Sequence, residues 1–130
     1  MEDSLYKEMI LDLYRNPLNK KVIVEATYRM KELNPSCGDE IEIMIQCDEQ
    51  GNILDIGHQG QGCAISQAAV SLLTEEVKGK NKKYAEQITE EQVMAMLQIP
   101  ISHTRTTCAT LGLKAMKQCI SHTESYADPT

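Results

Sequence analysis

Residues Glu40–Asp48, with the sequence EIEIMIQCD, decide the fold because isoleucine occupies every second position until a cysteine takes the last one. Successive side chains of a β-strand point to opposite faces, so this alternation predicts a strand with one buried face. The next four residues, EQGN (Glu49–Asn52), are typical of a turn, and ILDIGH (Ile53–His58) predicts a second strand. The three segments together predict a β-hairpin.

The segments around this hairpin predict helices, mostly on its C-terminal side. The spacing of apolar residues in Ser4–Pro17 indicates a short helix that stops at Pro17, and the branched residues of Lys21–Met30 indicate an extended segment. Beyond Gly62 the pattern is helical, and a capping-box sequence begins at Thr89. The three helices expected there span Cys63–Gly79, Thr89–Pro100 and Thr107–Ile120.

Strands followed by helices are typical of the α+β class. We therefore expect a small antiparallel sheet of about three strands covered by helices. A length of 130 residues fits one domain spanning 1–130, with 121–130 as a frayed polar tail.

The charge and the cysteine content exclude several kinds of partner. A net charge of −6 argues against binding to nucleic acid or to an anionic membrane surface. The chain has no apolar run of the roughly 20 residues that a membrane span needs, and its acidic N-terminus is unlike a signal peptide. We therefore expect a cytoplasmic protein. Its five cysteines would be reduced there, which favours metal binding or thiol chemistry over disulfides.

The five cysteines have different surroundings. Cys47 continues the inward series of its strand, and Cys119 shares a helical stripe with Leu111 and Ala115, so both are expected to pack as buried thiols. Cys119 also lies 11 positions (119 − 108) along the same expected helix from Cys108, or about 16 Å, which is too far for one metal.

The other three cysteines stand at loops and helix starts. Cys37 lies in the loop NPSCGDE, Cys63 follows Gly60 and Gly62 at the start of a helix, and Cys108 is expected to open the last helix. Free N–H groups and partial positive charge at a helix N-terminus favour the thiolate form. The glycines predict a strand-to-helix turn, and they also permit close approach of the backbone to a metal.

Asp39 could join these three cysteines as a metal ligand. Three thiolates and one carboxylate make a tetrahedral set suited to Zn²⁺ or to the iron of a cluster, and the carboxylate would make the site more exchangeable. The alternative is that Asp39 is an ordinary turn residue among scattered cysteines. His58 and His103 are either substitute ligands or surface histidines.

Three segments of the chain resemble signature segments of one family. NPSCGDE (Asn34–Glu40), GQGCAISQAAVSLLTE (Gly60–Glu75) and RTTCATLGLKAM (Arg105–Met116) are similar to segments of the U-type iron–sulfur cluster assembly proteins, which comprise IscU, SufU and the N-terminal domain of NifU. The order of the segments also fits, and the resemblance covers nearly the whole chain. It implies a single α+β domain that receives sulfur from a cysteine desulfurase.

The resemblance also implies a site and its partners. Cys37, Asp39, Cys63 and Cys108 would be the metal ligands, holding Zn²⁺ in the resting state or a [2Fe–2S] cluster. Cys108 would be the sulfur acceptor, and Arg105 would stabilise the resulting anion or remain solvated. The partners would be a SufS- or IscS-type desulfurase and downstream apo iron–sulfur proteins or another scaffold. The chain would act as a scaffold or sulfurtransferase partner of that enzyme rather than as a stand-alone enzyme.

The chain combines features of two branches of the family. Isc-type members carry a histidine directly before the third cysteine and a Leu-Pro-Pro-Val-Lys motif, whereas this chain has Thr107 and the dissimilar LQIPISHT (Leu97–Thr104). Arg105 is similar to the Suf type. The 45 positions from Cys63 to Cys108 (108 − 63) are closer to the Isc-type length. The site is therefore closest to SufU.

Two other functions are compatible with the residues alone. A hydrolase could use Cys63 as a nucleophile with His58 or His103 as a base, but it would leave Asp39 and Cys108 without roles. A non-catalytic interaction module stabilised by zinc would explain the ligands but not the carboxylate among them.

Overall fold

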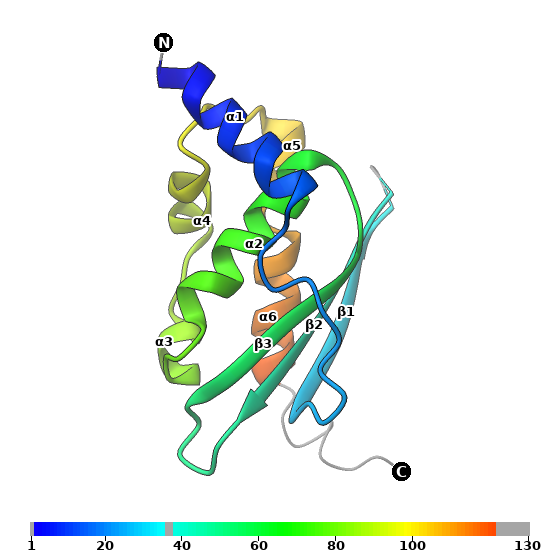
Figure 1. The fold of residues 1–130 in the computed structure, drawn as a ribbon, viewed down its shortest axis with the longest axis vertical. Helices are drawn as coiled ribbons and strands as arrows, with labels where there is room; N and C mark the ends of the chain where they lie inside the picture. The colour runs from blue at the N-terminus through cyan, green and yellow to red at the C-terminus, as the bar shows by residue number, and fades with distance from the viewer. Residues whose placement is uncertain (1, 36–37, 122–130) are drawn as a thin grey trace.

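A computed structural model describes residues 2–35 and 38–121 of the chain (Figure 1). Its sheet has three antiparallel strands in the order β1-β2-β3, which confirms the expected α+β class. The strands are β1 (Tyr28–Asn34), β2 (Asp39–Cys47) and β3 (Ile53–Gln61).

The alternating stretch forms the central strand, β2, as the sequence predicts. Ile41, Ile43 and Ile45 are all buried on the face that the helices cover. Met44 points to the other face and is buried as well. It pairs with Gly57 across the hairpin, where a glycine is needed because a Cβ would lie 2.6 Å from the carbonyl oxygen of Lys21. The chain before β1 therefore packs against the second face of the sheet.

The expected extended segment Lys21–Met30 is only partly a strand, since β1 begins at Tyr28. Residues before it instead run along the outer edge of β3, where the Lys21 amide donates to the His58 carbonyl at 3.1 Å, and then over the second face, where Ile23 lies beside Gly57. Val22 and Val24 remain exposed, so their β-branched character does not reflect pairing in the sheet.

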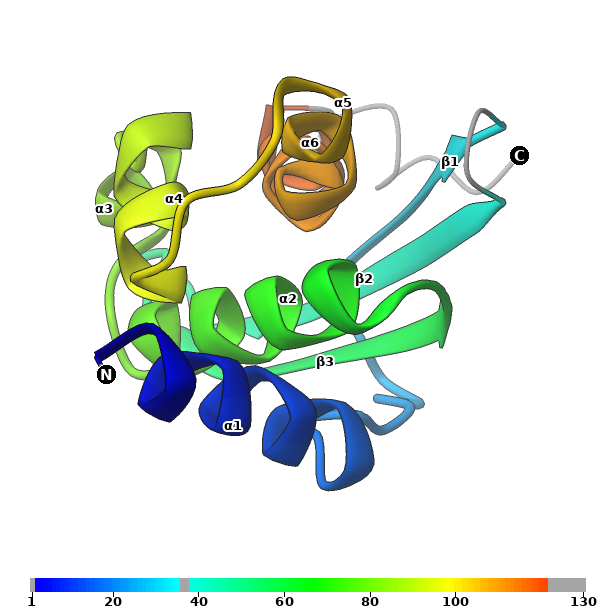
Figure 2. The ribbon, with the colours of Figure 1, turned by 90° about the horizontal axis from the view of Figure 1, so that it is seen from above.

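Helices cover one face of the sheet in two layers (Figure 2). Helix α2 lies over β3 and α6 lies over β1 and β2, while α1 packs against α2 from outside. The capping box predicted at Thr89 is present, with Gln92 as its second member. The helices are α1 (Glu2–Arg15), α2 (Ala64–Val77), α3 (Lys82–Glu86), α4 (Glu90–Leu97), α5 (His103–Ala109) and α6 (Leu111–Ser121).

The last helix differs from the prediction in two ways. It is divided at Thr110 into α5 and α6, and it begins at His103 rather than at Thr107. Threonine is a poor helix former, so the threonines around position 106 obscured the start. In the structure the Thr106 hydroxyl donates to the Ser102 carbonyl at 3.3 Å, and the Thr110 hydroxyl donates to the Thr106 carbonyl at 2.9 Å. Ser121 still belongs to α6, and the remainder of the expected tail lies outside the described residues.

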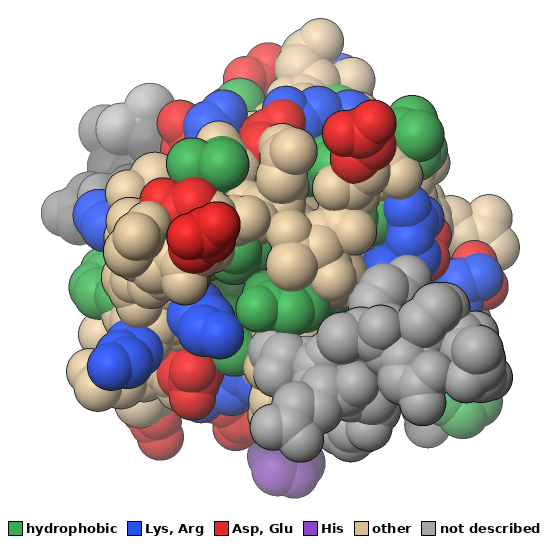
Figure 3. Space-filling model, turned by 90° about the horizontal axis from the view of Figure 1, so that it is seen from below, with side chains coloured by type: hydrophobic (Ala, Val, Ile, Leu, Met, Phe, Trp, Pro, Cys, Tyr) green, Lys and Arg blue, Asp and Glu red, His purple; other side chains and the backbone are tan. Residues whose placement is uncertain are grey.

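The end of the molecule that carries the β2–β3 turn has a mixed surface (Figure 3). Acidic and basic side chains are interspersed on it. Near this turn, where the Ile53 amide donates to the Lys80 carbonyl, the Lys80 side chain also pairs with Glu76 at 3.4 Å. The described part of this face therefore lacks the uniform positive charge that a polyanion would require. Among the described residues, no helix has the length and apolar character needed to cross a membrane.

Candidate metal centre

Asp39, Cys63 and Cys108 converge at the other end of the sheet. They come from the first residue of β2, the residue that caps α2 and the end of α5. One donor atom from each lies within 4.8 Å of the others, although 24 or more residues separate them along the chain. The fold therefore brings together a carboxylate and two thiols that no local motif connects.

Asp39 is 2% exposed, unlike a typical turn aspartate. Its Oδ1 accepts a hydrogen bond from the backbone N–H of Cys63 at 3.1 Å. A buried carboxylate is costly unless such donors compensate it, so this bond both holds the side chain in place and lowers the cost of burial. The carboxylate thereby joins the start of β2 to the start of α2.

Two glycines allow the start of β2, with Asp39, to lie close to the end of β3 and the start of α2. Gly60 has φ +124°, and a Cβ there would lie 2.0 Å from the Glu40 carbonyl oxygen. A Cβ on Gly62 would lie 2.7 Å from Asp39 Oδ1 and 2.3 Å from Ser66 Oγ. Gly60 therefore lies inside β3, where it pairs with Ile41, and not in the expected strand-to-helix turn, whereas Gly62 lies between β3 and α2 and leaves the space that the Asp39 carboxylate occupies.

Cys63 is the N-cap residue of α2, as the sequence predicts. Its backbone is extended, with φ −72° and ψ 170°, so that its carbonyl faces the first turn of the helix. Gln67 N–H and the Ser66 hydroxyl both donate to that carbonyl, at 3.1 and 3.0 Å. These bonds fix the direction in which the Cys63 side chain leaves the helix.

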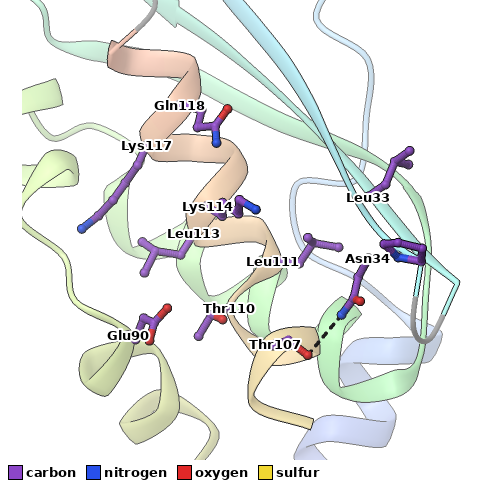
Figure 4. A pocket seen from close by; sticks show the side chains of 11 residues that line it. Leu33, Asn34, Glu90, Thr107, Thr110, Leu111, Leu113, Lys114, Lys117 and Gln118 are labelled. Carbon is purple, nitrogen blue, oxygen red and sulfur yellow. Dashed lines mark hydrogen bonds between the residues drawn. The ribbon is translucent and has the colours of Figure 1, made fainter. Parts of the chain in front are cut away.

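Cys108 is 1% exposed and is the next-to-last residue of α5, so the expectation that it opens a helix is wrong. The side-chain amide of Asn34 donates to Cys108 Sγ at 3.9 Å and to Thr107 Oγ1 at 3.2 Å, the second bond being drawn in Figure 4. Arg105 lies one turn before Cys108 on the same helix and is exposed.

Cys37 lies outside the described residues. It belongs to the four-residue connection, residues 35–38, between Asn34 and Asp39, which pair with each other across β1 and β2. Asn34 donates to Cys108, and Asp39 accepts from Cys63. Both ends of this connection therefore lie at the Asp39–Cys63–Cys108 cluster.

The profile of the family described as "NifU-like N terminal domain" matches residues 5–127. The chain belongs to this family. It is 31% identical to the zinc-dependent sulfurtransferase SufU of Bacillus subtilis, over 94% of this chain and 93% of that protein. It is 33% identical to the iron–sulfur cluster assembly scaffold protein IscU of Haemophilus influenzae, over 89% and 93%.

A solved structure supports the same grouping. The putative iron–sulfur cluster assembly scaffold protein for the SUF system from Fervidobacterium islandicum aligns with a TM-score of 0.73 and 26% identity, over 87% of this chain and 94% of that one. The resemblance to the U-type assembly proteins is therefore confirmed, and so is the fold that it implies.

The donor set of this NifU-like domain fits a metal. In a tetrahedral zinc site with Zn–S bonds of about 2.3 Å, ligand atoms lie about 3.8 Å apart. The Asp39, Cys63 and Cys108 atoms, within 4.8 Å of one another, need to move inward by no more than about 1 Å to reach that spacing. Three donors leave one tetrahedral position for a further ligand.

The remaining described cysteines lie apart from this group. Cys119 is buried, its thiol donates to the Ile43 carbonyl at 3.9 Å, and burial raises its pKa to about 12. Cys47 is only half-buried, so the expectation of a fully buried thiol is wrong, but burial still raises its pKa. Both thiols are therefore protonated at neutral pH, as packing residues would be.

The two histidines in the described part of the chain are also outside the group. His58 is 1% exposed, so its interpretation as a surface histidine is wrong. Its Nε2 lies 2.8 Å from the Leu18 carbonyl oxygen, and burial lowers its pKa. His103 is exposed at the start of α5, as expected of a surface histidine. Among residues 2–35 and 38–121, neither histidine joins Cys63 in this group, so a Cys63–histidine nucleophile pair receives no support there.

A pocket of about 540 Å³ opens beside the cluster (Figure 4). Asn34, Pro35 and Thr107 line its end nearest the cluster, and Leu111 and Leu113 contribute apolar side chains from α6. Lys114 and Lys117 line its other end. Asn34 was not predicted as a functional residue, and its place inside the first signature segment, Asn34–Glu40, is the one sequence signal that marks it.

Proposed function

We propose that this chain is an iron–sulfur cluster assembly protein that accepts sulfur from a cysteine desulfurase at a centre formed by Cys37, Asp39, Cys63 and Cys108. The observation that carries the proposal is the convergence of a carboxylate and two thiols from three separate elements within 4.8 Å. The relatives supply the activity, since one is named a zinc-dependent sulfurtransferase and another an assembly scaffold.

The sulfur-transfer step needs only thiol chemistry. The desulfurase presents a persulfide, and the thiolate of Cys108 attacks its outer sulfur. The S–S bond of the donor breaks, its electron pair leaves with the desulfurase thiolate, and a new S–S bond joins the outer sulfur to Cys108 Sγ. One persulfide and one thiolate are consumed and one of each is formed, so no further oxidant or reductant is required.

Zinc fits the centre in the resting state. When bound, it would supply positive charge that keeps the ligand thiols deprotonated. Cys37 and Cys63 serve mainly to hold the metal, and Asp39, an oxygen donor among sulfurs, makes the site more exchangeable. Arg105, exposed one helical turn from Cys108, provides a cation for the anionic sulfur.

The alternative cargo is a [2Fe–2S] cluster built on the same residues. The Haemophilus relative, named a scaffold protein, favours that possibility. Thr107 favours the relay, because it stands where Isc-type members have a histidine and so offers no nitrogen ligand when Cys108 leaves the metal. The sulfur would then pass to downstream apo iron–sulfur proteins or to another scaffold. The proposal places the chain in the cytoplasm, where free thiols stay reduced.

Native mass spectrometry of protein purified without air tests the proposal directly. We expect a mass that corresponds to one zinc per chain and a rise in desulfurase turnover when the chain is added. Asp39→Ala should impair this stimulation without abolishing it, whereas Cys37→Ala with Cys63→Ala should remove the metal. A stable [2Fe–2S] centre after anaerobic reconstitution, with zinc blocking activity, would establish the scaffold instead. Metal-free protein that leaves the desulfurase unaffected would refute both.

A further inference from the structure

We infer that Asn34 is a positioning residue for sulfur transfer, and that Thr107 orients it. The inference rests on the proposed function, because it concerns the sulfur acceptor of that reaction. Asn34 connects the sulfur acceptor to its neighbour on α5, since its side-chain amide donates both to Cys108 Sγ at 3.9 Å and to Thr107 Oγ1 at 3.2 Å.

The location of Asn34 suits this task. It is the last residue of β1, and the residue is 9% exposed between the sheet and α5. It also lines the 540 Å³ pocket together with Thr107, as Figure 4 shows. The amide therefore lies between the sulfur of Cys108 and the open pocket. From this position an N–H can keep its hydrogen bond to the sulfur during the reaction.

The chemistry of the step needs such a donor. During transfer the Cys108 sulfur leaves any metal as a thiolate and ends as the uncharged inner sulfur of a persulfide, so its negative charge needs stabilisation in the reacting thiolate, before the new S–S bond forms. An N–H donor stabilises charge on sulfur, and hydrogen bonds to ionised groups are stronger than those between neutral groups. An amide has no proton to lose near neutral pH, so it stays a donor throughout.

Thr107 supplies the orientation. A side-chain amide can present either its NH₂ or its carbonyl oxygen to a neighbour. The hydroxyl of Thr107 accepts one N–H of Asn34, and the same NH₂ group donates to Cys108. A neutral hydroxyl thus fixes the direction of a neutral amide, and neither group competes with the cysteines for a metal.

The test measures the first-order rate of persulfide formation on the chain in a single turnover with excess desulfurase, followed by the added mass of one sulfur atom. We expect Asn34→Ala to lower the rate at saturating desulfurase about five-fold, the loss of roughly one hydrogen bond, with an unchanged KM for the desulfurase. Asn34→Asp, which has the same size but no N–H, should be at least as slow. Zinc content and melting temperature are measured on each variant.

A second pair of variants separates positioning from structural support. Thr107→Val removes the hydroxyl and should lower the same rate by about two- to five-fold, whereas Thr107→Ser keeps the hydroxyl and should match the parent. This pair remains decisive if Asn34→Ala loses zinc or fails to fold.

Equal rates for Thr107→Val and Thr107→Ser would overturn the inference, and so would a parent-like rate for zinc-loaded Asn34→Ala. The parent chain keeps the two claims distinct. If the parent itself takes up no sulfur, the proposed function fails. If the parent takes up sulfur and the four variants do not follow this order, only the role of Asn34 and Thr107 fails.

Discussion

Asp39 begins strand β2 and Cys47 ends it, and the two ends of this one strand differ in kind. Nine residues of strand place them about 27 Å apart. Each end combines an aspartate and a cysteine in sequence or in space, Asp39 with Cys63 at one end and Asp48 with Cys47 at the other. Residue type alone therefore does not distinguish a site from a turn.

The partners of the two aspartates make the distinction. Asp48 accepts hydrogen bonds from the backbone of Asn52 and Gln50, at 2.9 Å each, and these bonds hold its pKa below the usual value. It therefore closes its own turn. Asp39 accepts from a helix start 24 residues away and lies beside two thiols. A carboxylate bonded to its own turn is structural, and one held by a distant element is available for chemistry.

Replacing one cysteine at each end gives the largest expected contrast. Cys108→Ser should abolish sulfur acceptance and desulfurase stimulation, because serine cannot form a persulfide. Cys47→Ser should leave both close to the parent values, since Cys47 lies apart from the cluster. Desulfurase turnover with each variant is the measurement. Full stimulation by Cys108→Ser would show that another residue accepts the sulfur.

Removing the metal should affect stability through the Asp39 end alone. The centre is assembled only in the folded chain, so bound metal stabilises the fold by several kcal/mol. A strong chelator should lower the melting temperature by on the order of 10 °C in the parent. The chelator should leave the melting temperature of the Cys37→Ala, Cys63→Ala double variant unchanged, because that variant holds no metal to remove. An unaltered melting curve after confirmed loss of metal contradicts this expectation.

Gly62 tests whether the Asp39 end depends on close packing. In Gly62→Ala the new Cβ would lie 2.7 Å from Asp39 Oδ1, so the carboxylate must move. We expect metal affinity to fall about 10- to 100-fold, as it does when a residue that supports a ligand is changed. Gly79→Ala is the control for a Gly→Ala change without a steric contact, because no atom lies within 4 Å of a Cβ added at Gly79, although Gly79, unlike Gly62, has positive φ. Competition with a zinc indicator measures the affinity of both variants, and equal loss in the two would show that displacement of the Asp39 carboxylate is not the cause.

The sequence predicts the structural features that depend on residues close together along the chain. The period of two in β2 and the capping box at Thr89 are both local patterns, and both are found as expected. The start of α5 was missed because Thr106 and Thr110 are poor helix formers, and their hydroxyls compensate by bonding back to carbonyls four residues earlier.

The features that the sequence does not reveal depend on contacts between residues that are far apart along the chain. The burial of His58 depends on the segment around Leu18, 40 residues away, whose carbonyl oxygen is a hydrogen-bond partner of the His58 ring at the edge of β3. Asn34 finds Thr107 and Cys108 at separations of 73 and 74 residues. The ligands themselves were identified from a family resemblance, since the chain has no C-x-x-C pair to mark them.

The smallest expected effect concerns Cys119, which packs under α6 against β2. Its pKa is raised from 9.0 to about 12, chiefly by burial, so the folded state holds the thiol proton more tightly than the unfolded state. This contribution to stability is fully present below pH 9 and is lost as the pH rises from 9 towards 12. Cys119→Ala removes it and also leaves a small cavity. Between pH 8 and pH 10 the free energy of unfolding should therefore fall by roughly 1 kcal/mol more in the parent than in Cys119→Ala. Denaturant titrations of the metal-free proteins at both pH values measure this difference, and the other thiols cancel in the comparison. Parallel pH profiles would mean that Cys119 is not held as a buried neutral thiol, and the separation between packing cysteines and the cysteines near Asp39 would lose its physical basis.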